Sequence, residues 1–365
     1  MYYALRIPVA AGLAAASFLS FRSARADLEF RRQDPESVAE SVALEPGNTE
    51  YLQFRALQLD YEGSDSTALL ERAAGLNPMS SAPRIRLGLA AETRRDFPAA
   101  EKWLLGASQI DRQFEPRWTL ANFYFRRGDR QKFWSWIRSA LEMSYGDRTP
   151  AFDLCWRMSG DAPEILQRAI PEQHEVLSSY VAYLLAAGKS DAAGSAAMKL
   201  APARNAPDRD LLLAVADALI AAQSADAAWS LWTAAGFGGV NFESPRVGRG
   251  FDWLRIASPG VAHLDIDQPR SAHRITLNGN QPESCDLLRR VLKLEPGLRY
   301  TLSWQSEPQP SGVEWRIAGQ RAALKDRELQ FNAPAELVTL TLAYERPHGE
   351  VRAEESFEIW NIEIR

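Results

Sequence analysis

The stretch SAPRIRLGLAAETRRDFPAAEKWLLGASQIDRQF, residues 81–114, holds two amphipathic patterns separated by a short polar turn. Its apolar positions recur at spacings of three and four residues, which places each set on one face of a helix. A small residue at the closest approach, Gly88, lets two antiparallel helices pack while larger neighbours fill the groove. The stretch therefore predicts a helical hairpin with these core positions: Leu87, Gly88, Ala91, Ala100, Leu104 and Ala107.

The same pattern recurs along the chain in steps of 34 residues, as at Phe54, Gly88 and Asn122. A 34-residue unit of two helices resembles the tetratricopeptide repeat (TPR), and the resemblance covers about five units within residues 47–237. A proline-containing irregular spacer is expected at 149–173. The sequence predicts a TPR-type α-helical solenoid, and an unrelated α-helical bundle is the alternative.

After residue 237 the apolar period changes from 3.6 to 2, as in Tyr300, Leu302 and Trp304. Short alternating segments are separated by turns rich in glycine and proline, such as Ser258-Pro259-Gly260. This pattern predicts an antiparallel β-sandwich, a jelly roll, over residues 238–365. The chain is therefore expected to be a multidomain protein, α first and then β.

Three segments resemble galactose-binding-like carbohydrate-binding modules: Asn241-Phe242-Glu243, VLKLEPGLRYTLSW at 291–304, and FEIWNIEI at 357–364. The resemblance implies a sandwich related to carbohydrate-binding domains. In that family the closing strand usually carries adjacent aspartates, and the first often holds calcium with the opening glutamate. Trp360 and Asn361 occupy those positions here. Because Ca²⁺ needs six to eight oxygen ligands, we expect no bound calcium. We also expect no other metal and no cofactor.

The N-terminus carries an uncharged run from Ile7 to Phe21, followed by Ala24-Arg25-Ala26. Its 15 residues are fewer than the roughly 20 of an untilted membrane-spanning helix. The pattern is typical of a signal peptide that is cleaved before Asp27. An uncleaved membrane anchor and a buried soluble helix are the alternatives. Residues 1–26 are therefore expected to be a signal peptide or anchor, and 27–46 a lead-in helix or linker.

Composition excludes several classes of protein. The 365 residues contain 42 Lys and Arg against 47 Asp and Glu, so the surface is not the cationic one that a nucleic-acid binder needs. Two cysteines cannot form a disulfide framework. No nucleophile elbow, His-Glu-x-x-His motif or phosphate-binding loop occurs, so the sequence nominates no catalytic residue and we expect no enzyme.

Two surfaces are candidate binding sites. The concave face of a TPR solenoid binds extended peptides, and the unit positions that would face it predict a protein-binding groove. The outer face of the sandwich, opposite its core, offers planar polar groups that suit sugar hydroxyls. An ordinary solvated face is the alternative for both. The residues are Tyr51, Arg55, Phe123, Arg126 and Arg127 for the protein groove, and Trp253, Arg290, Gln305, Glu314 and Arg316 for the glycan.

The combination resembles repeat proteins that accompany bacterial cell-surface polysaccharide synthesis or export. It predicts a non-catalytic exported adaptor, periplasmic or anchored to the inner membrane and facing the periplasm. The repeats would bind a protein partner, and the sandwich a glycan or an envelope assembly. No nucleic-acid partner is expected. Contact with a membrane is expected only through the N-terminal segment, if that segment is not cleaved. The alternatives are an envelope polysaccharide-modifying enzyme with an acidic cleft at the solenoid–sandwich junction, and a structural protein whose sandwich caps the solenoid.

Overall fold

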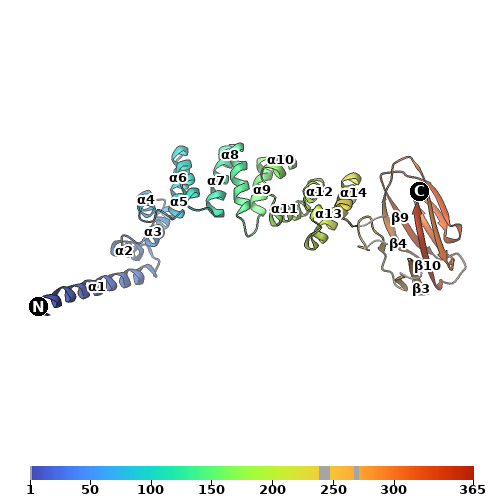
Figure 1. Cartoon of the computed structure of the whole chain (residues 1–365), viewed down its shortest axis with the longest axis horizontal. Coiled ribbons are helices and arrows are strands. Elements are labelled where there is room, and N and C mark those ends of the chain that lie inside the picture. The colour runs from blue at the N-terminus through green and yellow to red at the C-terminus, as the bar shows by residue number, and fades with distance from the viewer. Residues whose placement is uncertain (1, 238–246, 267–270) are drawn as a thin grey trace. The chain divides into compact units, whose positions relative to one another are not determined.

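The computed structural model describes residues 2–237, 247–266 and 271–365 (Figure 1). In these residues every α-helix lies before residue 235 and every strand after residue 253, so the predicted order of an α part and a β part is confirmed. The chain forms two compact units, Met1–Pro171 and Glu172–Arg365. Asn241-Phe242-Glu243, the first of the three segments that resemble carbohydrate-binding modules, lies outside the described residues.

The first unit consists of consecutive α-helices joined by short turns. Asn48, Asp96 and Asp129 begin three of them, because each side chain accepts hydrogen bonds from the first free backbone N–H groups of the helix. The helices are α1 (Tyr2–Phe30), α2 (Pro35–Leu44), α3 (Thr49–Tyr61), α4 (Thr67–Leu76), α5 (Ala82–Thr93), α6 (Phe97–Ile110), α7 (Phe114–Arg127), α8 (Arg130–Glu142), α9 (Thr149–Met158) and α10 (Ala162–Arg168).

The α5–α6 hairpin packs as its sequence predicts. A Cβ atom on Gly88 would lie 2.6 Å from the Leu104 side chain and 3.3 Å from the Ala100 carbonyl oxygen. The two helices therefore approach each other at a distance that only glycine permits. Leu87, Leu104 and Ala107 are buried around this point, so the predicted hairpin core is confirmed.

Successive hairpins are joined by contacts that repeat along the chain. The Arg86 guanidinium on α5 donates to the Gln53 carbonyl on α3 at 2.7 Å, across 33 residues. On the next pair, Arg126 of α7 binds Glu92 of α5, across 34 residues. The helices from α3 to α7 are thus stacked hairpins in which each contacts the next, as in repeat proteins.

The C-terminal half of α1 belongs to this stack. Ala26 is buried, and the Phe30 ring lies 4.6 Å from the Tyr51 ring and 5.3 Å from the Phe54 ring. The Tyr51 hydroxyl donates to Asp27. The helix runs without a break through the expected cleavage box. Across the described residues, no helix combines the length and the apolar character needed to cross a membrane.

The second unit begins with two further helical hairpins and continues into the sandwich. Phe251, just before the first strand, is buried between the rings of Trp229 at 5.1 Å and Trp232 at 5.8 Å. The last hairpin and the start of the sandwich therefore share one apolar cluster. The helices are α11 (His174–Ala186), α12 (Ser190–Ala197), the short 3₁₀ helices η1 (Ala201–Ala203) and η2 (Ala206–Asp208), α13 (Arg209–Ala221) and α14 (Ala225–Ala234).

The β part consists of two five-stranded antiparallel sheets, ordered β1-β4-β9-β6-β7 and β2-β3-β10-β5-β8 in the described residues. Trp304 and Trp315 lie in the core between them, so the predicted sandwich is confirmed. Gly260 (φ +72°) makes the predicted turn after Ser258-Pro259, and Gly312 (φ +78°) makes the turn before β6. The strands, with the 3₁₀ helix η3 (Leu324–Asp326), are β1 (Leu254–Arg255), β2 (Val261–Ile266), β3 (Ala272–Asn278), β4 (Ser284–Lys293), β5 (Arg299–Glu307), β6 (Val313–Ile317), β7 (Gln320–Ala323), β8 (Glu328–Asn332), β9 (Leu337–Glu345) and β10 (Glu354–Ile364).

Candidate functional site

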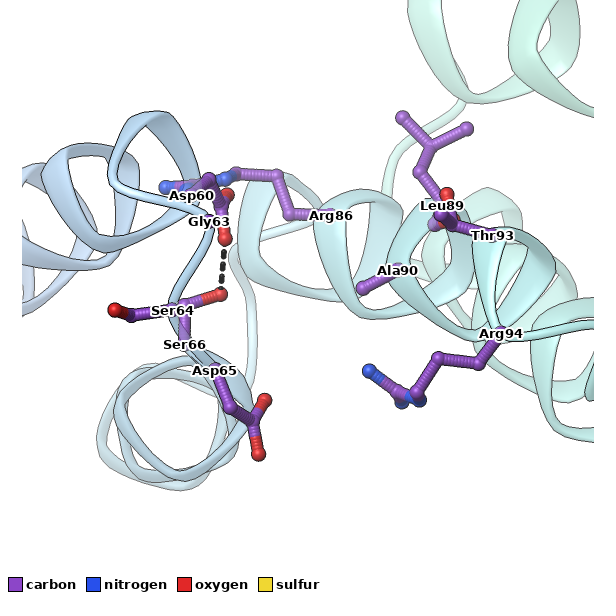
Figure 2. A pocket seen from close by; sticks show the side chains of 10 residues that line it. All are labelled: Asp60, Gly63, Ser64, Asp65, Ser66, Arg86, Leu89, Ala90, Thr93 and Arg94. Atoms are coloured by element: carbon purple, nitrogen blue, oxygen red, sulfur yellow. Dashed lines mark hydrogen bonds and ion pairs between the residues drawn. The ribbon is translucent and has the colours of Figure 1, made fainter.

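A groove of about 690 Å³ lies between the α3–α4 turn and helix α5 (Figure 2). It separates two consecutive hairpins of the first unit, so its walls come from different repeats. Leu89 and Thr93, two of its lining residues, lie one 34-residue unit before Phe123 and Arg127, whose unit positions are predicted to face the concave side of the solenoid. The lining residues are Asp60, Gly63, Ser64, Asp65, Ser66, Arg86, Leu89, Ala90, Thr93 and Arg94.

Asp60 and Arg86 hold the end of the groove nearest to α3. The Ser66 hydroxyl donates to Asp60 at 2.5 Å, and the Arg86 guanidinium forms an ion pair with the same carboxylate. Arg86 also reaches the Gln53 carbonyl. These polar groups pair with one another, so they shape the groove. Contacts with a ligand would come from the other lining residues.

The rest of the groove carries groups from both walls that are accessible to a ligand. Leu89 is 40% exposed, although it is a large apolar residue on a helix. Arg94 is exposed, and its guanidinium donates to the Thr67 hydroxyl at 3.3 Å. Asp65 accepts hydrogen bonds from the Thr67 hydroxyl and backbone N–H, which hold the pKa of Asp65 below its ordinary value. An apolar contact, a cation and an anion thus share one groove.

Two aromatic residues of the predicted protein-binding groove are buried, which corrects the expectation that they face solvent. Tyr51 is 3% exposed and Phe123 is 2% exposed. Tyr51 packs on Phe30 and donates to Asp27, both on α1, and Phe123 packs against Tyr124. The physical reason is local: α1 covers Tyr51, and Phe123 packs against the neighbouring Tyr124 ring on α7.

The three cations of that prediction are engaged within the repeats. Arg126 binds Glu92, and the Arg127 guanidinium lies 3.7 Å above the Phe97 ring. Arg55 contacts Gln58 at 3.2 Å and Glu62 at 3.5 Å. The structure therefore does not bring the five residues together as one exposed patch.

Two residues of the predicted glycan site are buried near the start of the sandwich, which is a second correction. Trp253 is 4% exposed, and its ring lies 5.9 Å from the core ring of Trp315. Arg290 is buried as well; its Nε donates to the Phe251 carbonyl at 2.9 Å, and burial lowers its pKa. Both side chains belong to the packing between the sandwich and the segment that precedes it.

Glu314 and Arg316 lie on the outer face as expected, but each is paired. Arg316 contacts Glu314 at 2.6 Å and Glu345 at 2.5 Å, while Arg321 contacts the same carboxylates at 3.3 Å and 3.0 Å. The four residues form a closed ring of alternating charges across β6, β7 and β9. A groove of about 610 Å³ adjoins this ring.

Gln305 is exposed on the outer face of the other sheet, opposite Trp360 in the register of β5 and β10. Strict alternation of side chains along a strand would place Trp360 on the core side with Ile362 and Ile364. A register shift after Trp360, with Asn361 in the left-handed region at φ +49°, turns Trp360 to the face opposite buried Phe357 and Ile359. Asn361 then donates to Gln305 at 3.3 Å.

The junction between α13 and the sandwich holds a small groove of about 310 Å³. Arg249 and the Gly250 backbone N–H both bind Asp217 of α13, at 2.8 Å and 3.0 Å. The described lining includes Arg249, Arg289 and Arg290 but only two carboxylates, Asp217 and Asp252. The acidic cleft that the enzyme alternative predicts does not occur in this part of the described chain. No group of three or more described His, Cys, Asp or Glu side chains could hold a metal ion.

No family model and no curated protein matches the chain. Among solved structures, the crystal structure of PilW, a widely conserved type IV pilus biogenesis factor, is similar over 60% of this chain and 92% of its own, with 14% identity and a TM-score of 0.29. The crystal structure of the P58(IPK) TPR domain covers 63% of this chain and 91% of its own, with 14% identity and a TM-score of 0.18.

Proposed function

We propose that the protein is a non-catalytic scaffold whose helical repeats bind an extended segment of another protein in the groove between the α3–α4 turn and α5. The observation that carries this proposal is Leu89, which is a large, exposed apolar residue inside a groove with polar walls. Covering it would remove apolar surface from water, which favours association. Stacked hairpins offer this kind of extended surface.

The groove also indicates the chemistry of its ligand. Leu89 fits an apolar side chain, and exposed Arg94 fits an acidic one nearby. The polar groups of the α3–α4 turn suit the backbone of an extended peptide. The expected ligand is therefore an extended segment with a bulky apolar residue close to an Asp or Glu.

Selection from a random-peptide library on the purified full chain tests this proposal. Peptides with an apolar and an acidic residue should be enriched, and L89D and R94E should each lower their affinity at least ten-fold. The control Y145A changes an exposed tyrosine outside the groove and should leave binding unchanged. Equal binding by L89D and the unaltered chain would exclude this groove as the site.

A second candidate function is glycan binding by the sandwich, and Trp360 is the observation that favours it. Trp360 shares the outer sheet face with Gln305 and Asn361, whereas the other three sandwich tryptophans are buried. An aromatic face and two neighbouring amides match the apolar face and the hydroxyl groups of a pyranose ring.

Affinity electrophoresis in gels that contain neutral polysaccharides tests this second function. The unaltered chain should be retarded, and W360A and Q305A should abolish the retardation. The control Y61A, at an exposed tyrosine of the repeats, should be retarded like the unaltered chain. Equal retardation of W360A and the unaltered chain would count against this face. An exported location, with a role in cell-surface polysaccharide synthesis or export, is also part of our proposal. It is supported only by the N-terminal pattern and the family resemblance, and fractionation of cells that express the full chain tests the location.

A further inference from the structure

The two halves of helix α1 have different surroundings. Its C-terminal half packs on the first repeat, where Ala26 is fully buried and the Ser23 hydroxyl donates to Glu45 of the α2–α3 turn at 2.8 Å. Every residue from Val9 to Phe21, by contrast, is exposed. One continuous helix thus carries a packed segment and an uncovered segment.

The uncovered segment, residues 9–21, is apolar on every side. It contains no charged residue. Val9 and Phe18, which are 55% and 65% exposed, are about two and a half helical turns apart and therefore lie on opposite sides. Leu19 and Phe21, also exposed, lie on the two flanks between them. A protein groove or a second copy would cover one face of such a helix, whereas a surrounding apolar medium covers all sides at once.

We propose that residues 9–21 insert into the hydrocarbon of a lipid bilayer, and that the chain keeps them, so that α1 fixes the first repeat at the membrane surface. Insertion removes the apolar side chains from water, and the helix satisfies its own backbone hydrogen bonds, which hydrocarbon cannot do. The segment measures about 20 Å along its axis, less than the roughly 30 Å of bilayer hydrocarbon, so we propose insertion and not crossing. This inference rests on the proposed exported location only for the identity of the membrane, and on neither binding function.

The contacts of α1 favour a chain that is not cleaved before Asp27. Cleavage there would remove Ala26, whose methyl group the fold buries, and Ser23 with its hydrogen bond to Glu45. Asp27, which would become the new terminal residue, accepts a hydrogen bond from the Tyr51 hydroxyl. The residues on both sides of the expected cleavage point therefore belong to the first repeat, and cleavage would remove part of its packing.

The uncovered and packed segments are joined by helix and not by a linker. Phe21 is the last exposed apolar residue before the contacts with α2, and Ala26 is buried about 8 Å further along the helix axis. Between them Arg25 forms an ion pair with Glu40 of α2. The first repeat would therefore lie close to the lipid, and the continuous helix would fix its orientation there.

Flotation with phosphatidylcholine vesicles tests the insertion. The full chain, diluted from detergent into vesicles, should float with them. V9E and F18E should each lower the partition coefficient at least about ten-fold, because each places a charge in hydrocarbon on an opposite side of the helix. The control M79E, at an exposed methionine outside α1, should float like the unaltered chain. A loss of flotation in only one of V9E and F18E would show that a single face is engaged, and that result, or no loss in either, would overturn the inference.

The intact mass of the chain recovered from the membranes of bacterial cells that express it tests whether the segment is kept. The mass should include the residues before Asp27. A chain that begins at Asp27 would overturn the inference and leave the exported location in place. Conversely, a chain that keeps its N-terminus, and that protease added to the outside of the inner membrane does not digest, would refute the exported location and leave the insertion supported by flotation.

Discussion

Arg126 on α7 binds Glu92 on α5 through two hydrogen bonds of 2.7 Å each, and the two residues are one 34-residue repeat apart. The pair is bidentate, the geometry in which a guanidinium and a carboxylate bind most strongly. It joins two hairpins at a face where a ligand-binding patch was expected. Arg126, which was expected to contact a protein partner, thus binds the neighbouring repeat instead.

Removing this pair should weaken the stack by a small amount. A double-mutant cycle with E92Q and R126Q should give a coupling energy of about 0.5–1 kcal/mol, because Arg126 remains partly exposed. Urea unfolding at low and high salt measures it, and high salt should reduce it. R72Q, at an exposed arginine, should change stability by less than about 0.5 kcal/mol. A coupling energy of zero would mean that the contact does not stabilise the stack.

Gly88 should not tolerate a methyl group. In G88A the new Cβ would overlap Leu104, which should lower the unfolding free energy by about 1–3 kcal/mol. G106A is the matched control, since Gly106 lies in α6 with its nearest neighbour at 3.9 Å. That change should raise the unfolding free energy by about 0.5–1 kcal/mol. Thermal unfolding compares the two, and effects of the same sign would contradict the close approach.

The residues just before the expected cleavage point should stabilise the first repeat. A chain that begins at Asp27 loses the buried methyl of Ala26 and the contacts of Ser23 with Glu45 and Arg25 with Glu40. It should be about 1–2 kcal/mol less stable than a chain that begins at Arg22. Urea unfolding compares both with the full chain. Equal stability of all three would show that this part of α1 is dispensable.

Phe251 should couple the last hairpin to the sandwich. F251A removes a buried ring between Trp229 and Trp232 and should cost about 3–5 kcal/mol. Hydrogen exchange should then increase in both α14 and the first strands. L254A, at a more exposed residue three positions away, should cost much less. Faster exchange in the strands alone would mean that the ring does not link the two parts.

Local patterns predicted the elements well and the exposed faces less well. Gly88 could be assigned to a helix–helix contact, because period and residue size are local properties. Tyr51 and Phe123 could not be placed, because their exposure depends on which side chains pack over them. The pairing of Arg126 with Glu92 did leave a signal: opposite charges separated by the repeat length.

Trp360 shows how one residue reverses an assignment of faces. Strict alternation along β10 puts Trp360 with Ile362 and Ile364, but the register shift at Asn361 exchanges the two sides of the strand. Phe357 and Ile359 are two apart, whereas Ile359 and Ile362 are three apart. That extra residue between apolar positions is the signal of a bulge, and it was present in the sequence.

The ring formed by Glu314, Arg316, Arg321 and Glu345 has a consequence for solubility. Strand β7 is the last of its sheet, so its outer backbone groups are available to a strand from another molecule. Arg321 lies on β7 and is held to Glu314 on the adjacent strand β6 and to Glu345 on β9, the strand after it. The ring therefore places four charges on the sheet face beside this edge, where an added strand with apolar side chains would meet them. We expect the ring to disfavour edge-to-edge aggregation at this border of the sandwich.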